Sequence, residues 1–429
     1  MKKIFQIEDS QANKISFYIL CYFLLTLPFD RFYSTLALIC FGIHTVIQLR
    51  RGSLRQLDIK KLAGTQAVFL LGVLCLIYSA QTEDGISKIG KQAAIFIFPL
   101  LLSLSSLDIK KYSLQLLGVF SLGCLGTILY LYYDALHVII HDHLPLTLIF
   151  STAFVNHNFS EPIDMHATYL SMYACLSLCY FIYQYLQIHD RTTRFLCIVA
   201  CAVLLAGIIQ LGSKTVLTAM LICVNFILPK LISTGKRKAL YYAISLSITF
   251  VLLTGIFSID IFKTRFVTEF KNDLSAQGLP SIPESRMARW QSACKLINRS
   301  PVTGYGTGSE SAVLNQQYFK DKLYIAYYYN LNTHNQYLSI ALEYGYTGLA
   351  IFLFSLVFAY YLAWKSRNML FQCFLVILIV AALSENILDS NKGIFFYAFF
   401  LTLFVIPSLA KKKTAASVKK QMQATLQPA

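Results

Sequence analysis

Apolar runs of about twenty residues recur along most of the chain and are separated by short polar stretches. Only helices and closed barrels satisfy their backbone hydrogen bonds inside a bilayer, and a spanning helix needs about 20 apolar residues. The runs lack the two-residue alternation of barrel strands, so they predict an all-α polytopic membrane protein. We expect about twelve spans, near residues 15–28, 33–49, 62–80, 92–107, 113–136, 165–187, 195–211, 215–229, 239–258, 346–364, 368–384 and 393–409.

One long polar stretch interrupts this pattern between the ninth and tenth expected spans. It predicts four parts: spans one to nine (1–258), a large external loop carrying the candidate chemistry (259–335), spans ten to twelve (336–410) and a basic tail (411–429). Within the loop, Ser281-Ile-Pro283-Glu284 predicts a capping box with proline in the first helical turn. Residues 285–299 follow with helical spacing. The residues expected to share the buried face of this helix are Met287, Trp290, Cys294 and Ile297.

Composition agrees with a membrane protein and changes the interpretation of the charge. Hydrophobic residues make up 56% and charged residues 14% of the sequence, whereas soluble domains carry about a quarter charged residues. A net charge of +16 would suggest nucleic acid in a soluble protein. Here the basic residues of short loops gather on one side of the expected spans, which predicts cytoplasmic termini and no nucleic-acid partner. The first apolar run has no small-residue cleavage site, so we expect no cleavable signal peptide.

Two groups of residues raise the question of metal binding. All cysteines except Cys294 fall in apolar stretches. The i,i+4 pairs Cys175/Cys179 and Cys197/Cys201 are interpreted as small helix-packing residues rather than metal ligands. The spacing of His137, His141 and His143 could bind a metal, although a polar loop at the membrane interface is the commoner explanation. We predict no metal site.

Several basic residues are expected at the external membrane surface. Arg286 falls among the apolar residues of the 285–299 helix, and an arginine on a packed face is costly without a partner. A phosphate ligand is therefore favoured for Arg286. For Arg289, at the edge of that face, phosphate binding and snorkelling to the headgroup level both stay open. Lys214 and Arg265 lie at the ends of spans on the same side, where either an anionic headgroup or an ordinary interfacial role explains them.

His334 begins the polar end of the helix that leads into the tenth span, and we expect it to share a face with Leu338, Ala341 and Gly345. An imidazole with a pKa near neutrality is well suited to take a proton from a hydroxyl. A structural histidine is the alternative. Because Glu343 falls on the opposite helix face, it is not assigned as the partner that orients His334.

Glycine and tyrosine punctuate the rest of the loop. Gly304-x-Gly306-x-Gly308 resembles a nucleotide-binding run, but no strand precedes it. A turn with positive φ angles that lets backbones approach closely explains it better. The tyrosines at 324 and 327–329 are expected to form an aromatic lip, at the membrane interface or stacked on sugars.

These motifs occur together in one known family. The motifs are Ser285-Arg286-x-x-x-Trp290 followed by Pro301-x-x-Gly304-x-Gly306; His334-Asn335-x-Tyr337-Leu338 with Glu343-x-Gly345-x-x-Gly348-Leu349; Met165-His166-Ala-Thr-Tyr169; and Glu385-Asn-Ile-Leu with Gly393. Over residues 165–393 the chain resembles the O-antigen ligase and polymerase superfamily. These are bacterial inner-membrane glycosyltransferases with a GT-C-like architecture that use polyprenyl-diphosphate-linked glycans.

The resemblance implies a set of roles. His334 would act as general base, and Arg265, Arg286, Lys214 and Arg289 would bind the donor diphosphate. Lys214 stands where the family usually has arginine, which keeps the charge but loses the bidentate fork. The supporting residues would be Asn335, Trp290, Tyr337 and Glu343. The resemblance implies no cofactor, no metal and no nucleotide, because the donor bond already carries the free energy.

The sequence therefore predicts an O-antigen ligase. It would transfer a glycan from undecaprenyl diphosphate to lipid A–core oligosaccharide, with inversion, on the periplasmic face of the inner membrane. An O-antigen polymerase, with a second lipid-linked glycan as acceptor, and a protein O-oligosaccharyltransferase remain alternatives. A polysaccharide flippase would instead predict internal repeats and ionisable residues at the midplane of the spans, and the sequence shows few of either.

Overall fold

The computed structural model describes residues 4–29, 31–49, 59–232, 234–274 and 285–409. Every regular element in these ranges is helical. The α-helices of the first part are α1 (Gln11–Thr26), α2 (Arg31–Ile47), α3 (Ile59–Cys75), α4 (Thr82–Leu104), α5 (Ile109–His141), α6 (His157–Ser160), α7 (Ala167–Gln187), α8 (Arg191–Leu211), α9 (Lys214–Ile222) and α10 (Lys236–Ser258). Those of the second part are α11 (Asp260–Lys263), α12 (Glu269–Leu274), α13 (Arg286–Arg299), α14 (Glu310–Lys320), α15 (Tyr324–Tyr328), α16 (Gln336–Lys365), α17 (Met369–Ala381) and α18 (Asn391–Leu409). The prediction of an all-α protein is confirmed for the described residues.

Each of the twelve predicted spans overlaps a helix, in the predicted order. Within the described residues, seven helices are long and apolar enough to cross a membrane: α4, α5, α8, α9 with its continuation to Leu231, α10, α16 and α18. The α6–α7 pair, bent by 85°, would be an eighth if it forms one span. Helices α1, α2, α3 and α17 are shorter, so the count of twelve spans stays a prediction. Helix α4 begins at Thr82, ten residues before the predicted start of the fourth span.

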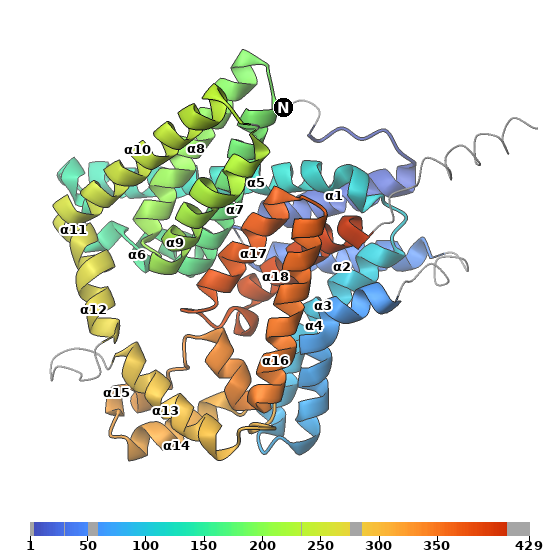
Figure 1. The fold of residues 1–429 in the computed structure, drawn as a ribbon, viewed down its shortest axis with the longest axis vertical. Helices are drawn as coiled ribbons and strands as arrows, with labels where there is room; N and C mark the ends of the chain where they lie inside the picture. Colours follow the sequence, from blue (N-terminus) through green and yellow to red (C-terminus); the bar gives the residue numbers. More distant parts are fainter. Residues whose placement is uncertain (1–3, 30, 50–58, 233, 275–284, 410–429) are drawn as a thin grey trace, which may run out of the picture.

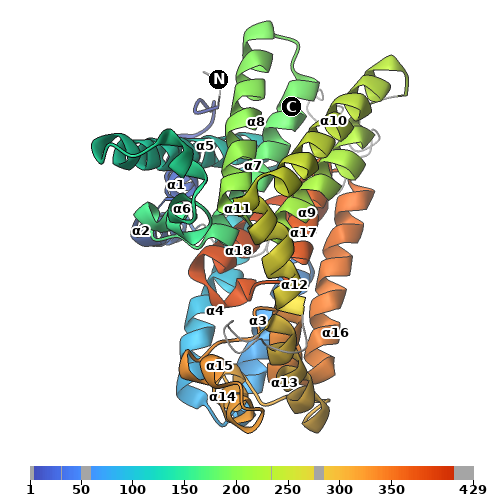
Figure 2. The same cartoon turned by 90° about the vertical axis from the view of Figure 1, so that its left-hand side faces the viewer.

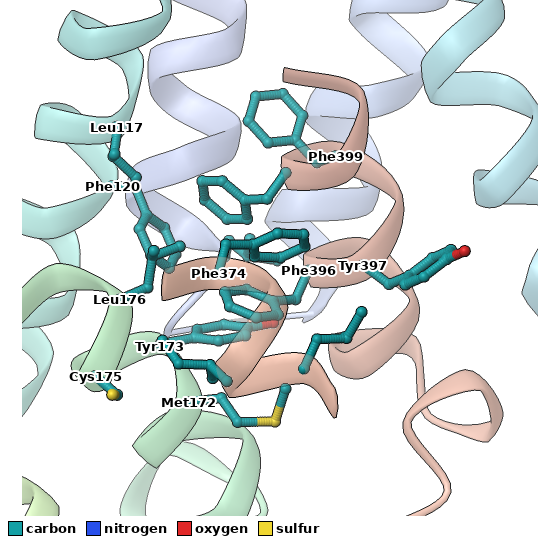
Figure 3. Close-up of a cluster of buried hydrophobic side chains, with 14 of the residues drawn as sticks. Leu117, Phe120, Met172, Tyr173, Cys175, Leu176, Phe374, Phe396, Tyr397 and Phe399 are labelled. Atoms are coloured by element: carbon teal, nitrogen blue, oxygen red, sulfur yellow. The ribbon is translucent and has the colours of Figure 1, made fainter. Parts of the chain in front are cut away.

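Helix α7 lies at the centre of the bundle, between α5, α8 and α17. Its Tyr173 stacks on Phe396 of α18 with 4.9 Å between ring centroids, and Phe120 of α5 lies 4.6 Å from Phe400. Phe374 of α17 joins the same aromatic cluster (Figure 3). These rings are fully buried, and edge-to-face and offset contacts of this kind favour one arrangement of the helices. The packing fixes the ends of α7, α17 and α18, which carry part of the candidate site.

The described part of the 259–335 segment folds onto one end of the bundle. Helices α13, α14 and α15 lie beside the ends of α4 and α16, opposite the free ends of α8 and α10 (Figures 1 and 2). A second small core holds them there, made of Ala293, Leu296, Ile297, Leu314, Tyr318, Ala326, Ala341 and Leu342. The tyrosines at 324 and 327–329 are exposed on this end.

The predicted buried face of α13 is confirmed at Ile297 and was wrong at Cys294. Its buried residues are Arg289, Ser292, Ala293, Leu296 and Ile297, whereas Cys294 is exposed. The helix packs through small residues against α14 and α16, so the contact face is rotated relative to the most hydrophobic face. Its N-cap is Ser285, whose hydroxyl accepts a hydrogen bond from the Ala288 N–H at 3.2 Å. The predicted capping box at 281–284 lies outside the described residues.

Helix α16 contains a break at Gly345, where φ is +66° and ψ is −171°. The loop with Gly304 and Gly306 inserts there: Gly306 N–H donates to the Glu343 carbonyl at 2.8 Å, and Tyr346 N–H donates to the Pro301 carbonyl at 2.7 Å. Gly304, Gly306 and Gly308 all have positive φ, which confirms the predicted close-approach turn. The break separates the first turns of α16, which lie before Gly345, from the longer apolar part of the helix that follows.

Gly345→Ala is expected to destabilise the fold strongly. A Cβ at this position would lie 2.2 Å from the Val302 carbonyl oxygen, on a backbone with positive φ. Left-handed strain and overpacking together predict a loss of roughly 2–6 kcal/mol. Thermal unfolding of the protein in nanodiscs measures the loss, with Gly126→Ala as control because nothing lies within 4 Å of its added Cβ. Equal melting temperatures for the two variants would contradict the prediction.

Candidate active site

His334 lies in a tight turn just before α16. Its φ is +46°, and the helix begins two residues later behind the N-cap Asn335, whose side chain accepts hydrogen bonds from Tyr337 N–H and Leu338 N–H. The side-chain oxygen of Asn332 accepts from His334 N–H at 3.0 Å. The expectation that His334 shares a helix face with Leu338, Ala341 and Gly345 was therefore wrong. The asparagine caps end the helical periodicity before it reaches the histidine.

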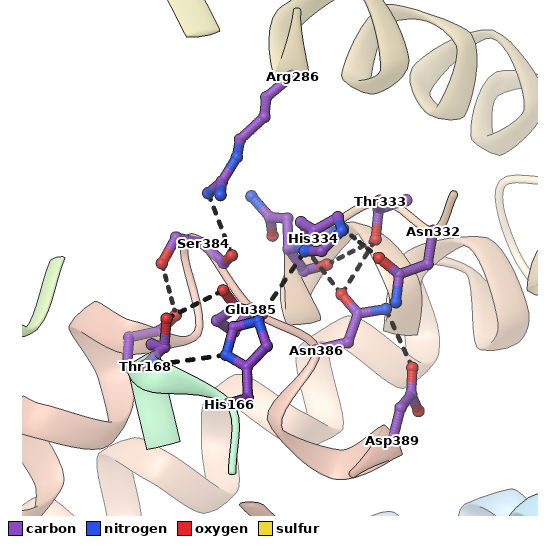
Figure 4. Close-up of polar contacts among 12 residues, drawn as sticks. His166, Thr168, Arg286, Asn332, Thr333, His334, Ser384, Glu385, Asn386 and Asp389 are labelled. Carbon is purple, nitrogen blue, oxygen red and sulfur yellow. Dashed lines mark hydrogen bonds and ion pairs between the residues drawn. The ribbon is translucent and has the colours of Figure 1, made fainter. Parts of the chain in front are cut away.

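Glu385, from the loop between α17 and α18, faces the imidazole (Figure 4). Its Oε2 lies 3.5 Å from His334 Nδ1, and its side chain is 8% exposed. Oε1 accepts a hydrogen bond from the Thr168 hydroxyl at 3.2 Å. Burial alone would raise the pKa of Glu385, but the contact with His334 and the nearby His166 and Arg286 lower it below its ordinary value. Glu385 is thus the anionic partner that orients His334.

His166 completes this side of the site. It is the N-cap of α7, where its Nδ1 accepts from Thr168 N–H at 3.3 Å, and its ring lies 4.2 Å from that of His157. Sequence reasoning noticed the segments with His166 and Glu385 only as motif resemblances, because they lie far from His334 in the chain.

Helix α13 holds the histidine turn through two side chains. Arg289 donates to the Asn332 carbonyl at 3.0 Å, and Trp290 Nε1–H donates to the Thr333 carbonyl at 2.9 Å. Arg289 is only 6% exposed. The diphosphate role expected for Arg289 stays a prediction. Arg289 and Trp290 both fix the carbonyls that precede His334.

Arg286, one turn before, points instead toward the open side of the site (Figure 4). Its NH1 group donates to the Ser384 carbonyl at 3.2 Å, next to Glu385. Its side chain is 29% exposed, and its Nε lies 3.9 Å from Asp273 Oδ2. Arg286 was predicted to lie on a packed face, but its side chain is only partly buried.

Lys214 and Arg265 belong to the same cluster of charges. Lys214 Nζ lies 3.2 Å from Asp273 Oδ2 and 3.7 Å from Glu269 Oε2. Arg265 pairs with Glu269 and donates from Nε to the Gly212 carbonyl at 3.3 Å. The structure thus brings Lys214, Arg265 and Arg286 together around two carboxylates of α12. Three partly buried cations thus share two carboxylates in this structure.

The remaining predicted supporting residues lie beneath the histidine turn. Tyr337 donates from its hydroxyl to the Ile379 carbonyl of α17 at 2.8 Å. Glu343 is 1% exposed and pairs with Lys88 of α4 at 2.9 Å. Glu343 therefore faces away from His334, in agreement with its exclusion as the orienting partner.

Comparison with known families identifies the segment that carries this geometry. Residues 166–353 match a family described as O-Antigen ligase. This segment belongs to the O-antigen ligase and polymerase superfamily. The resemblance inferred from the motifs is thereby confirmed. The family contains glycosyltransferase-like ligases and polymerases, which supports an enzyme that acts on lipid-linked glycans in a membrane. No curated protein matches the chain.

The matched segment includes His334 and the three clustered cations but not every residue of the site. It begins at His166 and ends inside α16. Glu385 lies beyond it in sequence, and Lys88 lies before it. The packing of α4, α17 and α18 against this segment is therefore needed to complete the site.

Possible metal ligands lie elsewhere. Among the described residues, the one group with metal-ligand spacing is Cys179, Cys223 and Cys373, whose sulfur atoms lie within 4.8 Å of one another in the helical core. Sequence spacing revealed only the pair Cys175/Cys179. His137 and His141 stack at 6.0 Å between centroids, and His141 contacts Asp142. Neither group reaches His334 through a contact that the structure records.

The lowered pKa of Glu385 predicts a pH-dependent stability. Its carboxylate contributes stability above its ordinary pKa near 4.5, and loses it as pH falls through the lower pKa of the folded state. Glu385→Gln is expected to cost about 1–3 kcal/mol near neutral pH, and the difference from wild type should narrow below pH about 4.5. Thermal unfolding from pH 7.5 to 4 measures it. The exposed Glu161→Gln serves as control, and a difference that widens toward acid would contradict the assignment.

Proposed function

We propose that the protein is an O-antigen ligase, which transfers a glycan from undecaprenyl diphosphate to lipid A–core oligosaccharide. One observation carries the proposal: His334, paired with the buried carboxylate of Glu385, lies beside the Arg286 end of a cluster of three cations. A general base next to an anion site suits a donor whose leaving group is a diphosphate.

In the proposed reaction, Glu385 orients His334 and His334 takes the proton of the acceptor hydroxyl. Glu385 engages Nδ1 of His334, so Nε2 is the nitrogen assigned to the acceptor hydroxyl. As Nε2 takes the proton, the hydroxyl oxygen attacks the anomeric carbon from the side opposite the diphosphate. The bond from that carbon to the diphosphate oxygen breaks, and the lipid diphosphate leaves with its electron pair. This displacement inverts the configuration and assigns no step to a metal, cofactor or nucleotide.

The cations Lys214, Arg265 and Arg286 would hold the diphosphate. They contact Glu269 and Asp273 in this conformation, so the donor phosphates would compete with these carboxylates. Charge on the leaving oxygen grows in the transition state, where fixed positive charges stabilise it most. Arg286 lies closest to the loop of Glu385 and is the cation we assign to the leaving phosphate.

The proposed topology follows the positive-inside rule. We infer twelve spans in the bacterial inner membrane, both termini in the cytoplasm and the active site facing the periplasm. Spans one to nine would occupy 1–258, the periplasmic loop 259–335, spans ten to twelve 336–410, and a cytoplasmic tail 411–429. The clustering of α13, α14 and α15 at one end of the bundle supports this division.

The test is transfer in vitro with purified full-length protein, an undecaprenyl-diphosphate glycan and lipid A–core, with EDTA present. Glycosylated lipid A–core would establish the ligase and the metal-independent mechanism together. Longer undecaprenyl-linked chains with unchanged lipid A–core would make the protein a polymerase. Transfer to a protein alone would indicate an O-oligosaccharyltransferase. Donor movement across vesicles without any transfer would indicate a flippase.

A further inference from the structure

A buried lysine joins α4 to the layer beneath the histidine turn. Lys88 is 13% exposed, and its Nζ lies 2.9 Å from Glu343 Oε2 and 2.8 Å from Asp389 Oδ1. Glu343 belongs to α16 and Asp389 to the turn before α18. Lys88 thus connects three elements that are distant in sequence, and none of the motifs includes it.

Asp389 also forms a hydrogen bond with Asn386. Its Oδ2 accepts a hydrogen bond from Asn386 Nδ2 at 3.0 Å. The same Nδ2 donates to Glu310 of α14 at 3.1 Å. With its amide nitrogen held by two carboxylates, Asn386 has one orientation, in which its oxygen faces the histidine turn.

The Asn386 oxygen then fixes both neighbours of His334. It accepts from Asn335 N–H at 2.8 Å and from the Thr333 hydroxyl at 3.2 Å. His334 itself sits between them with a positive φ, a conformation that a non-glycine residue keeps only when its surroundings hold it. Asn386 also directly follows Glu385, the partner of the imidazole. One short loop therefore sets both the base and its carboxylate.

The charges explain why this loop depends on Lys88. Glu310, Glu343 and Asp389 lie around one buried layer, with Lys88 in direct contact with two of them. Without the ammonium group, the carboxylates repel one another in a region of low polarity, and Asp389 has to move toward water or bind a proton. Either change alters its hydrogen bond with Asn386.

We propose that Lys88 is a positioning residue for glycan transfer, which holds the 385–389 loop so that Glu385 and His334 keep their geometry. The inference rests on the proposed function, in which His334 is the base. Displacement of a catalytic group by about 1 Å can cost about 10²-fold in rate. The effect should fall on kcat, since Lys88 contacts none of the cations assigned to the donor.

The experiment measures kcat and donor KM for the purified protein in nanodiscs, using the transfer assay above. Lys88→Met is expected to lower kcat by about 10²-fold and to change donor KM by less than about threefold. Lys88→Arg, which can keep both ion pairs, should recover most of the rate. Lys91→Met removes an exposed lysine from the same helix and is the matched control. A purely structural role for Lys88 would lower the melting temperature, but it would not lower kcat while leaving donor KM nearly unchanged.

If Lys88→Met does not fold, Asp389→Asn provides a second test of the inference. It retains an acceptor for Asn386 but loses the charge that binds Lys88, and should lower kcat by about tenfold. Wild-type kcat in a folded Asp389→Asn or Lys88→Met variant would overturn the inference. In that case, loss of transfer in His334→Ala would still support the proposed function. Absence of transfer by the wild-type protein would instead refute the proposed function itself.

Discussion

His334→Ala is expected to lower kcat for glycan transfer by about 10²–10⁴-fold, the usual contribution of a general base. The imidazole lies 3.5 Å from Glu385 Oε2 and is the group assigned to the acceptor proton. Donor KM should change little, because the diphosphate is assigned to Lys214, Arg265 and Arg286. Steady-state rates with an undecaprenyl-diphosphate glycan and lipid A–core measure both constants.

The control for this variant is His141→Ala. That side chain is 76% exposed, pairs with the adjacent Asp142 and stacks on His137 at 6.0 Å between ring centroids. Its kcat should equal that of the wild type. If His334→Ala retained more than about a tenth of the wild-type kcat while remaining folded, the histidine would not be the base, and the structural alternative would hold.

Arg286→Ala is expected to lower kcat/KM by about 10²–10³-fold, comparable to the loss of one donor that stabilises transition-state charge. The guanidinium reaches the Ser384 carbonyl at 3.2 Å, beside the carboxylate that orients the base. Unlike His334→Ala, this change should raise donor KM as well as lower kcat. Arg286→Lys should recover only part of the activity, because an ammonium group lacks the bidentate fork that matches a phosphate.

Arg299→Ala provides the comparison on the same helix. Arg299 is exposed at the other end of α13 and donates to Gln317 at 3.1 Å. Its removal takes away an equal charge outside the site and should leave kcat/KM within about twofold of wild type. Equal losses in the two variants would mean that the overall charge of α13, not the position of Arg286, governs donor binding.

The positions of the helices were largely predictable from the sequence. Apolar runs predict spans because lipid offers no hydrogen-bond partners, so the backbone must satisfy itself within a helix. The glycines at 304, 306 and 308 were predictable for a similar reason, since positive φ and close backbone contact exclude other residues. The break at Gly345 was not predicted, because that residue was expected inside a regular helix. The grouping of Lys214, Arg265 and Arg286 was implied by the family resemblance, and the structure brings these side chains together around Glu269 and Asp273.

The details of the site were not predictable from periodicity. The 3.6-residue repeat placed His334 on a helix face, but the cap at Asn335 ends the helix first. Helix α13 packs on α14 and places Arg289 against the Asn332 carbonyl, a contact that the spacing did not predict. A local cap thus overrode the periodicity at His334, and a contact with a distant segment set the position of Arg289.

The sequence by itself determined an all-helical membrane protein and the order of its helices, because these depend on local hydrophobicity and backbone constraints. Only the tertiary structure decided which groups meet. Glu385 reaches His334 across 51 residues, and Lys88 reaches Asp389 across about 300. Such meetings depend on how α4, α16 and α18 pack, and on the need to pair buried charges once they have packed.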